Sequence, residues 1–291
     1  MSSLTRPRIA IAGALLLVLG GAWLYASSAK ADATPAASAS NSTAQNLILG
    51  SKDSAQPENM EQFLTAVTKD VDAYWTKAFA DSGLPEPKVS YKWIPAGQTA
   101  ASACGDADGT LGDSAAAYCP GDDTIYISQK FATDIYDGAL DQALPGSSQG
   151  YGRTVGDFSV AYIVAHEYGH EVQDELGVFD QQLPTMAYEL QADCYAGTWA
   201  KSAYDENRLE DGDVQEALDA ALAVGDFDAS NPGHHGTPEQ RAAAWNSGFE
   251  AGDPSACDTY LDDSGLGGGG TTTQQDPTYG TPGQQDPSYG P

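Results

Sequence analysis

The chain has 291 residues, of which 41 are acidic and only 13 are basic, giving a formal net charge of −28. This charge argues against a nucleic-acid partner, because phosphate binding depends on clustered lysine and arginine. The length allows one or two domains. Composition alone therefore narrows the class of partner and gives no information about the type of reaction.

The first 31 residues have the layout of an export signal. Two arginines precede an uncharged apolar run at residues 9–25, and an A-x-A site follows at residues 29–31. The run is long for a signal peptide and slightly short for a membrane helix of about 20 residues. Residues 1–31 are therefore predicted to be either a cleaved signal peptide or a retained membrane anchor. In both cases the rest of the chain lies outside the cytoplasm, either secreted or attached to the membrane.

Low-complexity segments flank the central part of the chain. Residues 32–57 are rich in Ala, Ser and Thr and predict a flexible linker. Residues 261–291 contain a glycine run and two copies of a phrase, QQDPTYG and QQDPSYG, which predict a disordered tail. Residues 58–260 remain as one domain, long enough to bury a core.

Hydrophobic periodicity within this domain predicts one helix, two short strands and then four helices. Apolar residues at steps of three and four from Met60 to Phe79 predict the first helix, which ends near Gly83. The strands are expected at residues 88–94 and 124–128. The later helices are expected from Asp157, as N-cap, to about Leu176, from about 184 past 199, and at about 211–224 and 238–249. The predicted fold class is α+β, mainly helical with a small sheet.

Four cysteines in an exported chain favour two disulfides. Cys104 and Cys119 are close in sequence and bracket a Gly/Asp/Ala loop, so we expect them to pair with each other. Cys194 and Cys257 would then form the second bridge. Free buried thiols are the alternative.

A candidate metal site begins with the phrase HEYGH. His166 and His170 are four residues apart in a helical pattern, so both rings lie on one face and reach a single ion at about 2.0–2.1 Å. Glu167 would point beside the metal and take a proton from metal-activated water, and Gly169 would leave room there. The preceding FSVAYIVA indicates a buried helix, and buried imidazoles need a partner. An ordinary pair of hydrogen-bonded core histidines is the alternative.

The next predicted helix supplies two acids one turn apart. Glu189 and Asp193 share a face with Ala192, Ala196 and Ala200, whose small side chains would allow close approach to the first helix. A catalytic zinc takes three protein ligands and keeps one position for water. We expect one zinc per chain, with Glu189 as the third ligand and Asp193 accepting a ring N–H from a ligand histidine. Spacing alone also allows the two roles to be exchanged.

The two remaining histidines, His234 and His235, are adjacent in the phrase NPGHHGTPEQR. Neighbouring side chains on an extended segment point in opposite directions, so only one of them would face the metal. The following helix is capped at Thr237.

Four segments of the chain resemble the bacterial "putative neutral zinc metallopeptidase" family. They are GDFSVAYIVAHEYGHEVQ (156–173), ELQADCYAGTWA (189–200), HGTPEQR (235–241) and CG…YCPGDDTIYIS (104–128). The resemblance spans about residues 59–260 and implies a zincin-like fold with zinc bound in the gluzincin manner. The matching positions are His166, His170 and Glu189 for the zinc ligands, Glu167 for the catalytic glutamate, and Asp193 for the acid that binds a ligand histidine. The segment before Glu58 and the residue Glu171, where many members have histidine, depart from the pattern.

These observations predict an exported zinc metallopeptidase that hydrolyses peptide or protein substrates. In zincins a strand placed like residues 124–128 pairs with extended substrate, which would favour peptides over small molecules. His235 resembles the first residue of the H-P-x-x-x-x-R phrase of related gluzincins, with Arg241 six residues later. It is predicted to donate a hydrogen bond to the oxyanion, or else to cap or pack its loop. An exported zinc-binding scaffold without turnover and an amidase acting on cell-wall peptide are the alternatives.

Overall fold

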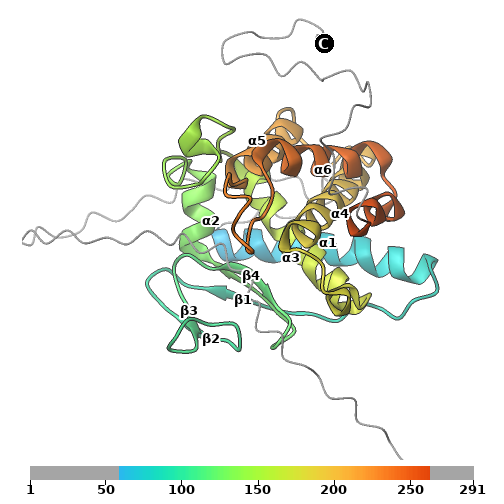
Figure 1. Cartoon of the computed structure of the whole chain (residues 1–291), viewed down its shortest axis with the longest axis horizontal. Helices are drawn as coiled ribbons and strands as arrows, with labels where there is room; N and C mark the ends of the chain where they lie inside the picture. Colours follow the sequence, from blue (N-terminus) through green and yellow to red (C-terminus); the bar gives the residue numbers. More distant parts are fainter. Residues whose placement is uncertain (1–58, 263–291) are drawn as a thin grey trace, which may run out of the picture.

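The computed structural model describes residues 59–262. The predictions for residues 1–31 and 32–57, and for nearly all of the tail at 261–291, lie outside these residues. Figure 1 shows a small sheet on one side of the central helix α3 and the helices α4, α5 and α6 on the other. This arrangement places α3 in the interior.

The sheet is built after a long N-terminal helix. Helix α1 (Met60–Asp81) is capped by Asn59 and buries an apolar face. Strands β1 (Ser90–Ile94), β5 (Thr124–Ser128) and β4 (Ala116–Cys119) form a sheet in the order β1-β5-β4. Strand β1 is parallel to β5, and β4 is antiparallel to it. The two-residue strands β2 (Ala100–Ala101) and β3 (Thr110–Leu111) form a separate ladder.

Five helices follow the sheet and complete the core. They are α2 (Gln129–Tyr136), α3 (Asp157–Glu175), α4 (Thr185–Asp205), α5 (Asp213–Val224) and α6 (Pro238–Ala251). Helix α3 packs against α1, β4, α4 and α5, and every residue from Phe158 to Gln173 is buried. Polar side chains on α3 therefore lie in the core, where they need hydrogen-bond or ionic partners.

The predicted fold class is confirmed, because the described residues form an α+β domain that is mainly helical with a small mixed sheet. Strand β5 has the predicted bounds, while β1 begins two residues later than expected. Asp157 is the first residue of α3 and not its N-cap, which is Gly156 with a φ of 92°. A residue with a side chain rarely adopts that φ, so the backbone selects glycine there.

Both expected disulfides are present, Cys104–Cys119 and Cys194–Cys257. The first joins the segment after β2 to the last residue of β4, and the second joins α4 to the C-terminal 3-10 helix Pro254–Leu261. Within residues 59–262, none of the helices has the length and apolarity needed to span a bilayer. The apolar run at residues 9–25 lies outside these residues.

Candidate metal centre

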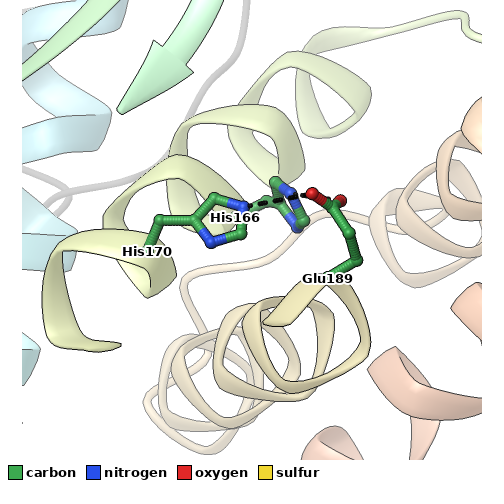
Figure 2. A group of neighbouring side chains, drawn as sticks. All are labelled: His166, His170 and Glu189. Atoms are coloured by element: carbon green, nitrogen blue, oxygen red, sulfur yellow. Dashed lines mark ion pairs between the residues drawn. The ribbon is translucent and has the colours of Figure 1, made fainter. Parts of the chain in front are cut away.

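Two helices bring the three predicted ligands together. His166 and His170 lie one turn apart on α3, and Glu189 lies near the start of α4. Figure 2 shows the three side chains pointing toward one another across the gap between the helices. All three are buried, and one donor atom from each lies within 4.8 Å of the others.

The donor atoms fit a single zinc ion. His166 Nε2 is 3.3 Å from Glu189 Oε2, and His170 Nε2 is 3.6 Å from Glu189 Oε1. Two atoms that each lie about 2.0–2.1 Å from a tetrahedral ion are about 3.3–3.4 Å apart. Two imidazoles and one carboxylate are donors that zinc accepts, and three ligands leave the fourth position for water. The residues present therefore suit a catalytic zinc.

Asp193 lies on the opposite side of the His166 ring from Glu189. Its Oδ1 is 2.9 Å from His166 Nδ1 and accepts a 2.6 Å hydrogen bond from the Tyr162 hydroxyl. Arg241 donates to both Asp193 oxygens, at 2.7 and 2.9 Å. Because a carboxylate accepts, His166 donates through Nδ1 and keeps the Nε2 lone pair for a metal.

Arg241 lowers the pKa of both acids of the site, Glu189 and Asp193. Burial opposes ionisation of a carboxyl group, but the guanidinium together with His166 and His170 outweighs burial and holds the pKa of Glu189 well below its usual range. Arg241 and His166 together lower the pKa of Asp193 against the same opposing effect of burial. Arg241 Nη1 is 3.2 Å from Glu189 Oε2, and its side chain is almost fully buried. The charged arginine thus has two anionic partners, which offset the cost of removing it from water.

Glu167 faces the sheet. The backbone N–H of Tyr118 in β4 donates to Glu167 Oε2 at 2.8 Å. Burial raises the pKa of Glu167, against the lowering effect of His166 and His170. A buried carboxylate beside a metal site, with its pKa moved toward neutrality, has the properties of a general base.

Gly169 has a different role from the one predicted. The sequence predicts that it leaves room beside the metal. A Cβ atom at this position would lie 3.0 Å from Ala192 Cα and 3.2 Å from Ala192 Cβ. The absent side chain therefore allows α3 and α4 to approach each other closely, and Ala192 is the member of the predicted small-residue stripe that lies at this contact.

Glu171 occupies the position that departs from the resembled family pattern. It is fully buried, and neither carboxylate oxygen has a hydrogen-bond partner within residues 59–262. Burial, together with neighbouring carboxylates, raises its pKa to about 8. Glu171 is therefore protonated at neutral pH and is not one of the three grouped metal donors.

The structure brings His234 and His235 to Asp226, which follows α5. His234 Nδ1 makes a short hydrogen bond to Asp226 Oδ1, and His235 Nδ1 is 3.1 Å from Oδ2. The backbone N–H of His235 also donates to Oδ2, at 2.8 Å. Partial burial opposes the charge on Asp226, but these hydrogen bonds lower its pKa. Asp226 thus fixes both histidines, and the predicted oxyanion role of His235 stays a prediction.

Several residues of the site are absent from the predicted set. Gln173 follows His170 by three residues, a helical spacing that could have pointed to it. The sequence pattern points to Arg241 only through its spacing from His235 along the chain. Tyr118 is 49 residues from its partner Glu167, and Asp226 is 9 residues from its partner His235. No local pattern connects either pair.

Most of the chain matches one known protein family. The model of the family described as "Putative neutral zinc metallopeptidase" matches residues 6–260. The match extends well before Glu58, where the sequence motifs alone predict that the resemblance ends. No solved structure matches the chain significantly.

Curated relatives point to the same group. Uncharacterized protein YpfJ of Escherichia coli K12 is 33% identical over 232 residues, covering 71% of this chain and 74% of YpfJ. Uncharacterized protein Rv2575 of Mycobacterium tuberculosis H37Rv is 34% identical over 224 residues, covering 68% and 69% of the two chains. The chain therefore belongs to the family described as "Putative neutral zinc metallopeptidase".

Proposed function

We propose that this chain is an exported zinc-dependent metallopeptidase that hydrolyses peptide bonds. The observation that carries the proposal is the buried cluster of His166, His170 and Glu189 with the carboxylate of Glu167 beside it. A zinc-binding scaffold without turnover would need the three ligands but not a carboxylate next to the first of them. Membership of a zinc metallopeptidase family supports the choice of metal.

The proposed mechanism assigns one task to each residue. Zinc held by His166, His170 and Glu189 would polarise the scissile carbonyl and make a water molecule more acidic. Glu167 would take the proton of the attacking water and return it to the leaving amine. The Tyr118 N–H would hold the Glu167 carboxylate in place during both transfers.

Extended peptide would pair with β4. The predicted pairing strand, residues 124–128, is the centre of the sheet, because β5 has β1 on one side and β4 on the other. The predicted pairing of substrate with residues 124–128 is therefore wrong, because both edges of β5 are already paired with neighbouring strands. Ala115 and Ser128 form a hydrogen-bonded pair, so by alternation Ala116 and Tyr118 direct their backbone groups away from β5. The Tyr118 N–H is taken by Glu167, so the backbone groups of Ala116 and the carbonyl of Tyr118 would be the ones that add a substrate strand.

We also propose that His235 donates a hydrogen bond from Nε2 to the oxyanion that forms during attack; because Nδ1 already donates to Asp226, this role requires a proton on both ring nitrogens. Asp226 accepts from both the backbone and the ring of His235, which restrains the direction of the ring. A restrained donor loses little freedom when the transition state forms, and one such donor is typically worth about 2.7–4 kcal/mol.

Export is proposed from the N-terminal pattern and from the cysteines. Disulfides persist in oxidising compartments and are rare in the cytosol, and the chain pairs all four of its cysteines. Residues 9–25 would serve either as the core of a cleaved signal or as a membrane anchor. Peptide or protein would be the partner outside the cytoplasm.

The test combines metal analysis with a peptide-library digest. The purified chain should contain about one zinc and cleave peptides, and chelation should abolish cleavage. Glu167→Gln should retain the metal and lose turnover by orders of magnitude, because it removes a base and leaves the ligands intact. Glu171→Gln, an equally buried change one turn further along α3, is the matched control and should retain turnover. Full activity in Glu167→Gln would refute the mechanism, and zinc without cleavage in the unchanged protein would favour a scaffold.

A further inference from the structure

The side chain of Gln173 joins the two helices of the metal centre. It is fully buried on α3. Its Oε1 is 2.8 Å from His170 Nδ1, and its Nε2 is 2.7 Å from the backbone carbonyl of Tyr188 and 3.1 Å from Gln191 Oε1. Both of the latter residues belong to α4. The amide nitrogen therefore donates to residues of α4, and the amide oxygen contacts His170.

The partners fix which way this amide points. A backbone carbonyl has no proton to donate, so the amide nitrogen must face Tyr188. The amide oxygen then faces His170 and accepts. The proton of the neutral His170 ring must consequently lie on Nδ1, which leaves the Nε2 lone pair for a metal ion. That Nε2 atom is the one that lies 3.6 Å from Glu189 Oε1.

Gln173 accepts from His170, as Asp193 accepts from His166, but the two acceptors differ in charge and in their other contacts. His166 donates to the carboxylate of Asp193, which carries a charge and is itself held by Arg241. Gln173 is neutral and also reaches the carbonyl of Tyr188, the residue directly before Glu189. One side chain thus touches the ring of one proposed ligand and the backbone next to another.

We propose that Gln173 is a positioning residue of the metal centre, which sets the tautomer of His170 and holds His170 and Glu189 at the separation that one zinc ion requires. The inference rests on the proposed zinc site and adds to it a residue that touches neither substrate nor metal. Its effect falls on metal binding before it falls on turnover. Loss of such an outer partner typically weakens metal affinity about 10–100-fold.

Three variants separate the parts of this role. Gln173→Met keeps the length of the side chain and removes both the acceptor for His170 and the link to α4. Gln173→Glu keeps an acceptor for His170 but places a carboxylate against the oxygens of Tyr188 and Gln191. Gln191→Met is the matched control, because it removes a buried amide from the same network and leaves the contact with His170 in place.

The first measurement is the tautomer of His170 by imidazole ¹⁵N NMR of the metal-free full-length chain. The unchanged protein, Gln191→Met and Gln173→Glu should show the proton on Nδ1, and Gln173→Met should populate the Nε2–H form. A merely structural role for Gln173 would lower thermal stability without moving the proton between the ring nitrogens.

The second measurement is zinc affinity by competition with a chelator. Gln173→Met should bind zinc about 10–100-fold more weakly than Gln191→Met, and Gln173→Glu should also be weaker because it loses the link to α4. Equal zinc affinity in Gln173→Met and Gln191→Met, with the proton still on Nδ1, would overturn the inference. If Gln173→Met does not fold, the zinc affinity of Gln173→Glu is the test. An affinity in Gln173→Glu equal to that of Gln191→Met would then overturn the inference. If the unchanged chain binds no zinc, the proposed function fails, and the NMR result still decides the tautomer part.

Discussion

Glu189 and Asp193 lie one helical turn apart on α4 and contact opposite sides of the same ring. Glu189 lies toward Nε2 of His166, while Asp193 accepts from Nδ1 and is held by Arg241. Only Glu189 also approaches the second histidine, His170. The geometry therefore supports Glu189 over Asp193 as the third ligand.

This difference predicts distinct effects on metal content. Glu189→Ala should lower the zinc retained by the purified chain, because it removes a ligand. Asp193→Asn keeps an acceptor for His166 and should weaken zinc affinity by about 10–100-fold. Zinc content and affinity are measured by metal analysis and chelator competition. If Asp193→Ala strips the metal while Glu189→Ala retains it, the two roles are exchanged.

The adjacent histidines give a kinetic prediction. His235→Ala should reduce kcat by about 10²–10³-fold, the usual loss for one oxyanion donor, while zinc content and KM change little. His234→Ala is the matched control, because it removes the other ring bound to Asp226. Steady-state kinetics and metal analysis check both variants. Normal turnover in His235→Ala, or loss of its zinc, would rule out the oxyanion role.

Sequence spacing could locate the residues whose relation is helical and local. His166 and His170, and Glu189 and Asp193, are each four apart, so helix geometry alone places each pair on one face. The contact of Arg241 with Asp193 depends on how α6 packs against α4, 48 residues away. No periodic pattern encodes such a contact, which is why the residue that lowers the pKa of both acids was missing from the predicted site.

Among the elements, the starts of α3 and α5 bring acids together. Asp213 is almost fully buried, and its carboxylate accepts from the backbone N–H of Glu210. Burial, together with Asp157, Glu216 and Glu210, raises the pKa of Asp213 from an ordinary 3.8 to about 7. Between these two values the folded chain holds a proton that the unfolded chain has released.

The contribution of Asp213 to the free energy of unfolding should therefore fall as pH rises from about 4 to about 7. It should be lost above the pKa of Asp213 in the folded chain. Asp213→Asn keeps the acceptor for Glu210 and removes the charge. Its free energy of unfolding should depend less on pH in this window and exceed that of the unchanged protein near pH 8. Urea unfolding at several pH values measures this, with the exposed neighbour Asp211→Asn as control. Equal pH slopes in the two variants would contradict the assignment.

Long helices were predictable, and short elements were not. Buried residues of α1 recur at steps of three and four along the helix, so its helical pattern is strong. Helices α3 and α4 are buried on nearly all sides, and their ends were marked by residues near Asp157, Gly177 and Pro184. Strand β4 has four residues, Ala116–Cys119, all buried, and therefore shows no alternation of polar and apolar side chains. Its place at the sheet edge beside Glu167 depends on tertiary packing, so the sequence pattern points to the neighbouring strand β5 as the substrate strand.

In the molecule as a whole, the two disulfides act on different regions. Cys194 follows Asp193 on α4 and pairs with Cys257, 63 residues later, whereas Cys104 and Cys119 are 15 residues apart. Loop-closure entropy gives about 4 kcal/mol for the longer loop and about 3 kcal/mol for the shorter one. The longer bridge also fixes the helix that carries Glu189.

Replacing Cys194 and Cys257 by alanine should lower both the free energy of unfolding and the affinity for zinc. The pair Cys104→Ala and Cys119→Ala is the control and should lower stability while leaving zinc affinity nearly unchanged. Chemical denaturation and chelator competition measure the two quantities, and non-reducing peptide mapping checks the pairing. Four alkylatable thiols in the native chain would contradict this account.

The contact between Gly169 and Ala192 also bears on which ion the site prefers. A methyl group at Gly169 would require α4 to move by a few tenths of an ångström, because the added Cβ would meet Ala192 backbone at 3.0–3.1 Å. Glu189 would move with it, and the cavity would then suit an ion of larger radius, such as cadmium. Gly169→Ala should thus raise the ratio of cadmium to zinc affinity, measured by competition between the two ions. The ionic radius that the protein selects would depend on one missing methyl group between two helices.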